Sequence, residues 1–129
     1  MSIETAITAA LSAIPALQRG GETAVYQDAF PQPEGGAPVW PAVRFTLTGG
    51  TVYEDLCGDG DDNADDVRVQ IDVVAETTAE RRAIWDAVRA AMKTVVPPAV
   101  LQGPPVMSPD METRTYRAMG DWMIFGSSD

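Results

Sequence analysis

The side chains most able to do chemistry in this sequence lie in one acidic segment, residues 54–66. It holds seven carboxylates: Glu54, Asp55, Asp59, Asp61, Asp62, Asp65 and Asp66. Alternating oxygen ligands such as Asp59, Asp61 and Asn63 are typical of the start of a calcium-binding loop. The pattern then fails, because Ala64 replaces the turn glycine and Gln70 replaces the bidentate glutamate. The sequence therefore favours a solvated acidic loop over a tight calcium site, and we assign no metal ligand.

Candidates for enzymatic chemistry are few. The chain has no histidine, which excludes a histidine general base, the usual catalytic triads and most zinc sites. A catalytic carboxylate needs burial and a fixed partner to shift its pKa, and the acidic segment offers no apolar pocket. Gly58 and Gly60 begin a GxG pattern, but aspartates follow it and would repel a pyrophosphate. We therefore predict a non-enzymatic protein that has no catalytic residues and no cofactor.

Composition and charge define the class of protein. With 129 residues, of which 45% are apolar and 22% charged, the chain is predicted to form one domain over residues 1–129. The formal net charge of -10 should repel DNA phosphates and anionic membranes. No apolar run reaches the length of a membrane span and no signal sequence is visible, so we expect neither insertion nor secretion. The single Cys57 favours a reducing compartment, in which the chain would assemble.

Two segments have the apolar spacing of amphipathic helices. The first is predicted over residues 2–13 and ends before Pro15. The second begins at a capping box formed by Thr77 and Glu80. The second helix is predicted to end before Pro97 and to bury one face, which carries Ile84, Trp85, Val88 and Met92.

Alternating apolar and polar residues predict the strands. Residues 43–48 and 67–73 alternate clearly, whereas residues 24–27 and 113–125 give weaker signals. Four prolines in residues 30–41 and five in residues 96–109 predict irregular loops there. The resulting order predicts an α+β fold, with an antiparallel sheet of four or five strands and two helices packed on one face. Its core should bury four residues together: Val69, Ile71, Ile84 and Val88.

Several aromatic and methionine side chains are candidates for contacts with a partner. Trp40 lies between Pro38 and Pro41, and aromatic residues on proline-rich loops often make interfaces. Met107 and Met111 flank Pro109, where flexible thioethers suit contacts between subunits, although gap-filling within the domain is the alternative. Phe30 and Gln32, at the start of the same proline-rich loop as Trp40, complete the set of candidate interface residues: Phe30, Gln32, Trp40, Met107 and Met111.

An ordered set of motifs resembles a known family. The stretches VYQDAFPQPEGGAPVWPAVRFTLTGG and DDVRVQIDVVAETTAERRAIWDAVRAAM are similar to the tail-completion, or tail-terminator, proteins of long-tailed bacteriophages and gene transfer particles. The matching pieces are a VY strand, a PQ loop, a proline-flanked second strand, an RVQIDV strand and a helix rich in alanine and arginine. The resemblance spans residues 1–95 and continues weakly into the last strand.

The resemblance implies a structural virion protein at the head-proximal end of the tail. It would form a homo-oligomeric ring, commonly of six subunits, that caps the tail tube, stops polymerisation and joins the tube to the head through a connector or stopper protein. DNA would pass through the ring without specific binding. The acidic loop residues Asp59, Asp61, Asp62, Asp65 and Asp66 would then lie on the rim or in the lumen, or would simply face solvent. A connector or stopper neck protein and, from another class, a small acidic calcium-binding protein or carboxylate-based enzyme are the alternatives.

Overall fold

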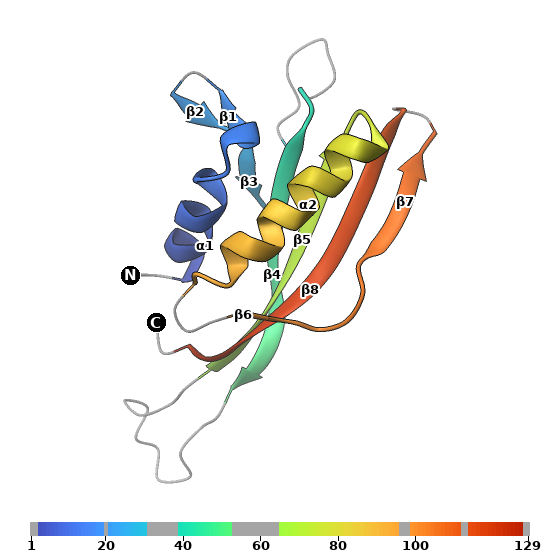
Figure 1. Cartoon of the computed structure of the whole chain (residues 1–129). Coiled ribbons are helices and arrows are strands. Elements are labelled where there is room, and N and C mark those ends of the chain that lie inside the picture. The colour runs from blue at the N-terminus through green and yellow to red at the C-terminus, as the bar shows by residue number, and fades with distance from the viewer. Residues whose placement is uncertain are drawn as a thin grey trace, which may run out of the picture.

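A computed structural model describes residues 3–19, 21–30, 39–52, 65–95, 99–111 and 114–127. These residues form two α-helices, one 3-10 helix and eight strands (Figure 1). In chain order the elements are α1 (Ile3–Ser12), η1 (Pro15–Leu17), β1 (Gln18–Arg19), β2 (Glu22–Thr23), β3 (Val25–Gln27), β4 (Ala42–Val52), β5 (Asp65–Ala75), α2 (Thr78–Met92), β6 (Ala99–Leu101), β7 (Val106–Asp110) and β8 (Thr115–Ser127).

Six of the strands form one sheet. Its order is β3-β4-β5-β8-β6, and β7 also pairs with β8, beyond β6 along the same side of that strand. The pairing of β3 with β4 is parallel, and all other pairings in the sheet are antiparallel. β1 and β2 form a separate antiparallel pair. Strand β3 therefore lies at one lateral edge of the sheet, whereas β6 and β7 share the opposite edge.

The core lies between the two helices and one face of the sheet (Figure 1). Alternate residues of β5 point to this face, because successive side chains of a strand point to opposite sides. Val69, Ile71 and Val73 are fully buried there, and their partners on β4 are Leu47, Phe45 and Val43 respectively. The helices contribute buried side chains at helical spacing, namely Ile3, Ile7 and Leu11 from α1 and Ile84, Trp85, Val88 and Met92 from α2. The predicted cluster of Val69, Ile71, Ile84 and Val88 is confirmed.

The beginning of α2 confirms the predicted capping box. The backbone N–H of Glu80 donates to the Thr77 hydroxyl oxygen at 3.0 Å. The Glu80 carboxylate in turn accepts a hydrogen bond from the backbone N–H of Glu76 at 3.1 Å. Two N–H groups without helical partners are thereby satisfied, and α2 begins at the predicted place.

Three expectations need correction. The sheet has six strands rather than four or five, and its β3-β4 pair is parallel. Residues 96–109 are not wholly irregular, because β6 and β7 both pair with β8. Pro109 is tolerated in β7 because an edge strand needs ladder hydrogen bonds on one side only. Finally, Asp65 and Asp66 belong to β5, opposite Val52 and Thr51, rather than to a loop.

Candidate assembly surfaces

Trp85 fixes helix α2 to strand β8. Its indole is buried and lies beside the indole of Trp122, with ring centroids 5.3 Å apart and planes at 47°. Gly120 of β8 faces the same indole, and a Cβ atom at this glycine would overlap with Trp85 Cη2. The close approach holds one side of α2 next to the β7 edge of the sheet. That side carries Arg81, Arg82 and Arg89.

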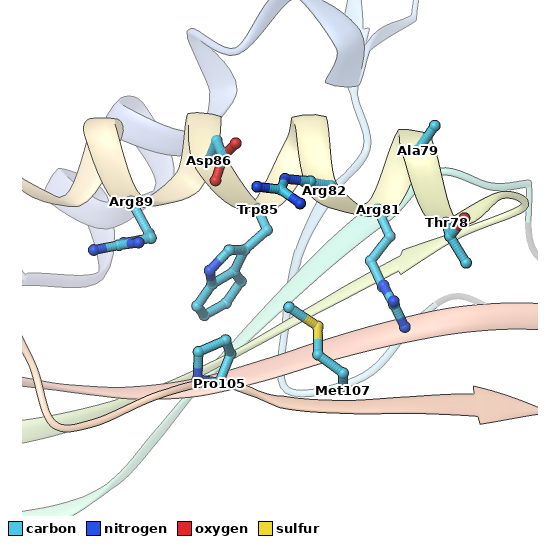
Figure 2. A pocket seen from close by; sticks show the side chains of 9 residues that line it. All are labelled: Thr78, Ala79, Arg81, Arg82, Trp85, Asp86, Arg89, Pro105 and Met107. Atoms are coloured by element: carbon cyan, nitrogen blue, oxygen red, sulfur yellow. The ribbon is translucent and has the colours of Figure 1, made fainter.

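A groove of about 480 Å³ lies between α2 and β7. Figure 2 shows Trp85 and Arg81 extending from the helix toward Pro105 and Met107 on the strand segment below. Its lining is Thr78, Ala79, Arg81, Arg82, Trp85, Asp86, Arg89, Pro105 and Met107. We call this feature the arginine groove. Its floor is apolar, and its rim is formed by long charged side chains of the helix.

The arginine groove is positive within a strongly negative chain. It holds three of the nine basic residues of the sequence and one carboxylate, Asp86. Arg81 is held in place, because its Nη1 donates to the Arg117 carbonyl oxygen at 3.4 Å and its guanidinium lies 5.8 Å from the centre of the Tyr116 ring. The Nε atoms of Arg81 and Arg117 are buried and have no hydrogen-bond partner within the described part of the chain. Arg82 and Arg89 are exposed and can reach a ligand.

Exposed apolar side chains lie along the β6-β7 edge. Met107 faces the groove, whereas Val100 and Val106 lie on the sheet face that the helices leave uncovered. Among the described residues, five large apolar side chains are exposed, and four of them lie here: Val100 (49%), Val106 (58%), Met107 (45%) and Met111 (82%). Apolar side chains gathered at one place on a surface mark interaction sites more often than single ones do. We call these four residues the apolar edge. Methionine, tryptophan and arginine together have the composition of a protein interface.

The opposite edge of the sheet carries an aromatic cluster beside β3. Phe30 lies edge-to-face against Trp40, with ring centroids 5.1 Å apart, and against Tyr26 at 6.1 Å. The guanidinium of Arg44 lies 5.1 Å from the centre of the Phe30 ring. Val39, next to Trp40, is 70% exposed and is the fifth exposed apolar residue. The rings of this cluster are half-buried and pack against the core.

Asp72 positions the arginine of this cluster. Its Oδ2 accepts a hydrogen bond from Arg44 Nε at 3.1 Å and also contacts Arg44 Nη2. Arg44 and Asp72 are directly opposite in the β4-β5 register, on the sheet face that the helices leave uncovered. The Asp72 side chain is only 6% exposed. A buried carboxylate needs a partner of opposite charge, so Asp72 holds Arg44, which in turn supports Phe30.

A protein-family model now places the chain among known proteins. The model of the tail completion protein gp17 family matches residues 5–122. The chain belongs to this family. No curated protein matches the chain. This tail completion protein is therefore a structural component of a bacteriophage tail, as the motif resemblance implied, and it works alongside other tail components.

The candidate interface residues of the tail completion protein fall into two groups. Phe30 and Trp40 are in contact beside β3, whereas Met107 and Met111 lie on the β7 edge. Gln32 lies outside the described residues, as do Asp59, Asp61 and Asp62 of the acidic segment. Asp66 is buried at the start of β5, so it does not belong to a solvated loop. The structure thus separates the candidate contacts into two surfaces at opposite edges of one sheet.

The arginine groove was not predicted from the sequence. The signal that could have revealed it is the spacing of Arg82, Arg89 and Trp85, which places two exposed arginines along one side of a helix whose tryptophan is buried. The part of the groove that β7 contributes could not be predicted from the sequence, because the prolines in residues 104–109 indicated an irregular loop. In the described residues, no three of the metal-binding side chain types come together. No described helix is long and apolar enough to span a membrane.

Proposed function

We propose that the chain is a tail terminator: it forms a homo-oligomeric ring that caps the tail tube, stops its polymerisation and joins it to the head. The observation that carries this proposal is the presence of two unlike contact surfaces at opposite edges of the sheet. The apolar edge and arginine groove lie at one edge, and the aromatic cluster and Val39 lie at the other. A ring needs a heterologous interface, in which one surface of each subunit contacts a different surface of the next.

The ring proposed here contains six subunits, the number that the family resemblance implies. Its other partners are the tail tube protein on one side and a connector or stopper protein on the other. With a net charge of -10, the subunit surface does not attract DNA phosphates, so DNA passes through the ring without specific binding. The whole chain acts as one domain, which assembles in the host cytoplasm and ends up in the virion.

Light scattering on the purified protein tests ring formation. We expect a discrete species of about six subunits, visible as rings in electron micrographs. Replacing Val106 and Met111 with Asp should give folded monomers, because two charges would be buried without partners in the subunit contact. Replacing the exposed Thr8 of helix α1 with Asp is the control outside the residues of both surfaces. A monomeric wild-type chain at every concentration would contradict the ring.

Particles made without the protein test the terminator role. If the ring stops tube polymerisation, tails formed in its absence should be longer than normal and variable in length. A connector or stopper acts after the tail is complete, so its loss would leave tail length unchanged and heads unattached. Tails of normal length without this protein would therefore favour the neck-protein alternative.

A further inference from the structure

We propose that the arginine groove binds residues 54–64 of the neighbouring subunit, the part of the acidic segment that joins β4 to β5. The contact would repeat around the ring and would be its principal electrostatic link. This inference rests on the ring proposed above and assigns the heterologous interface to two named parts of the chain. It requires first that the groove can accept a carboxylate-rich peptide. It also requires that this segment complements the charge of the groove better than the rest of the chain does, and that the segment comes from another copy.

The chemistry of the groove suits a carboxylate-rich peptide. Arg82 and Arg89 are exposed on its rim, and a guanidinium group can donate two parallel hydrogen bonds to one carboxylate. Trp85 and Met107 supply an apolar floor beneath such pairs. An ion pair at an interface is screened less where water is excluded. Arginine and tryptophan are also the residues that contribute most to binding energy at protein interfaces.

Charge complementarity selects the occupant. Residues 54–64 hold five of the 19 acidic residues and no basic residue. Outside residues 54–64 the chain has 14 acidic and nine basic residues, so these residues account for half of the net charge of -10. The groove holds three basic side chains against the single carboxylate of Asp86. The most acidic part of the chain therefore complements its basic groove.

Chain geometry keeps the segment away from the Arg81 end of its own subunit's groove. Val52 and Asp65 are paired, so the 12 residues between them leave and re-enter the sheet at the same end. Tethered at both ends, such a segment extends by at most about six residues, or roughly 21 Å. Arg81 contacts Arg117, whose partner on β5 is Val74, nine residues from Asp65 and thus about 30 Å away along the strand. A subunit's own segment cannot reach the Arg81 end of its groove.

The strand order gives the contact the head-to-tail character of a ring. The acidic segment joins β4 to β5, on the half of the sheet nearer to β3, and the arginine groove lies beside β7 at the other edge. When the β3 edge of one subunit meets the β7 edge of the next with the two sheets offset along their strands, the segment of the first subunit is brought toward the groove of the second. Each subunit then gives one segment and receives one, as a closed heterologous ring requires.

The test compares two defective variants with a matched control. The groove variant carries Arg82→Glu and Arg89→Glu, and the segment variant carries Asp59→Asn, Asp61→Asn and Asp62→Asn. Both should stay folded by circular dichroism, and both should raise the concentration at which rings dissociate by about tenfold or more. The control, Arg68→Glu with Lys93→Glu, changes the same net charge at exposed positions outside the groove and should keep rings intact. Ring dissociation is measured by mass photometry on dilution.

Mixing the two defective variants tests the direction of the contact. The segment variant retains an intact groove, and the groove variant retains an intact segment, so one mixed interface is productive. We expect an equimolar mixture to form heterodimers without closed rings. Combining Arg82→Glu and Arg89→Glu with Asp61→Lys and Asp62→Lys in one chain should restore rings, because both charges are then reversed.

Each other outcome counts against the inference. Rings that persist equally in the wild-type chain and in both defective variants would overturn this interface while leaving the ring itself in place, and the acidic segment would then belong to the rim, the lumen or solvent. Rings lost in the control as readily as in the groove variant would show a general effect of charge and would also overturn it. A wild-type chain that never forms rings would contradict the proposed function as well.

Discussion

The indole of Trp85 packs directly on the backbone of Gly120, so the absence of a side chain at residue 120 sets how closely helix α2 approaches strand β8. A Cβ atom at Gly120 would also come within 3.3 Å of the Trp122 ring. Since the arginine groove is formed between α2 and β7, this glycine also determines the position of the groove. The pair therefore couples the stability of the core to the shape of a candidate assembly surface.

Gly120→Ala should lower the free energy of unfolding by about 1 to 3 kcal/mol, because the added methyl group overpacks the space occupied by two indoles. Thermal or urea denaturation measures the loss. The same substitution in a Trp85→Leu background should cost less, since the smaller side chain leaves room for the methyl group. Equal costs in the two backgrounds would show that the contact between Trp85 and Gly120 does not limit the packing.

Ile84→Ala should destabilise the protein by about 2 to 5 kcal/mol, because it leaves a cavity between α2 and the sheet. Ile84 is 2% exposed and belongs to the core cluster with Val69 and Ile71. Lys93→Ala, at an exposed position just after the same helix, is the control and should change stability by less than about 0.5 kcal/mol. An unchanged melting curve for Ile84→Ala would contradict the assigned helix face.

Thr77→Ala should lower the free energy of unfolding by about 1 kcal/mol, because the backbone N–H of Glu80 loses its hydrogen-bond acceptor. Thr77→Ser keeps the hydroxyl group and serves as the matched control. Chemical denaturation of both variants checks the prediction. If Ser and Ala variants were equally destabilised, the methyl group rather than the cap would account for the effect.

Arg44→Met should cost about 1 to 3 kcal/mol, because it leaves the buried carboxylate of Asp72 without its ion-pair partner. Arg44 is 28% exposed, which keeps the cost toward the lower part of this range. Adding Asp72→Leu to Arg44→Met should recover part of the loss, since no charge then remains buried. A double variant less stable than Arg44→Met would show that Asp72 is stabilised by groups other than Arg44.

Much of the fold could be predicted because local signals agreed with the tertiary packing. The alternation of residues 67–73 predicted which face of β5 is apolar, and the spacing of residues 84–92 predicted which face of α2 is apolar. These two faces pack against each other in the core. The capping box marked the start of α2 to within one residue. The strand predicted over residues 43–48 is part of β4, which shifts register between Leu47 and Gly49 and then continues to Val52.

The rest of the fold depends on contacts that are distant in sequence. β6 and β7 are short and half exposed, and β7 contains Pro109. They are strands only because β8 supplies partners on one side. The parallel pairing of β3 with β4 likewise follows from where the chain returns and not from the composition of residues 25–27. The same holds for the arginine groove, whose lining comes from residues 78–89 and 105–107. The separation of Phe30 from Met107 across the sheet could not be predicted from their residue types.

Pro109 gives the β7 edge a further property. An open edge strand that also exposes valine and methionine is a template on which other molecules could add strands and grow into fibres. Pro109 has no backbone N–H to donate, and Pro104 and Pro105 come just before the strand, so a continuous hydrogen-bonded ladder cannot form along this edge. Side chains remain free to make contacts that the backbone cannot. A free subunit awaiting its neighbours is thereby protected against amyloid-like aggregation at the surface it must keep exposed.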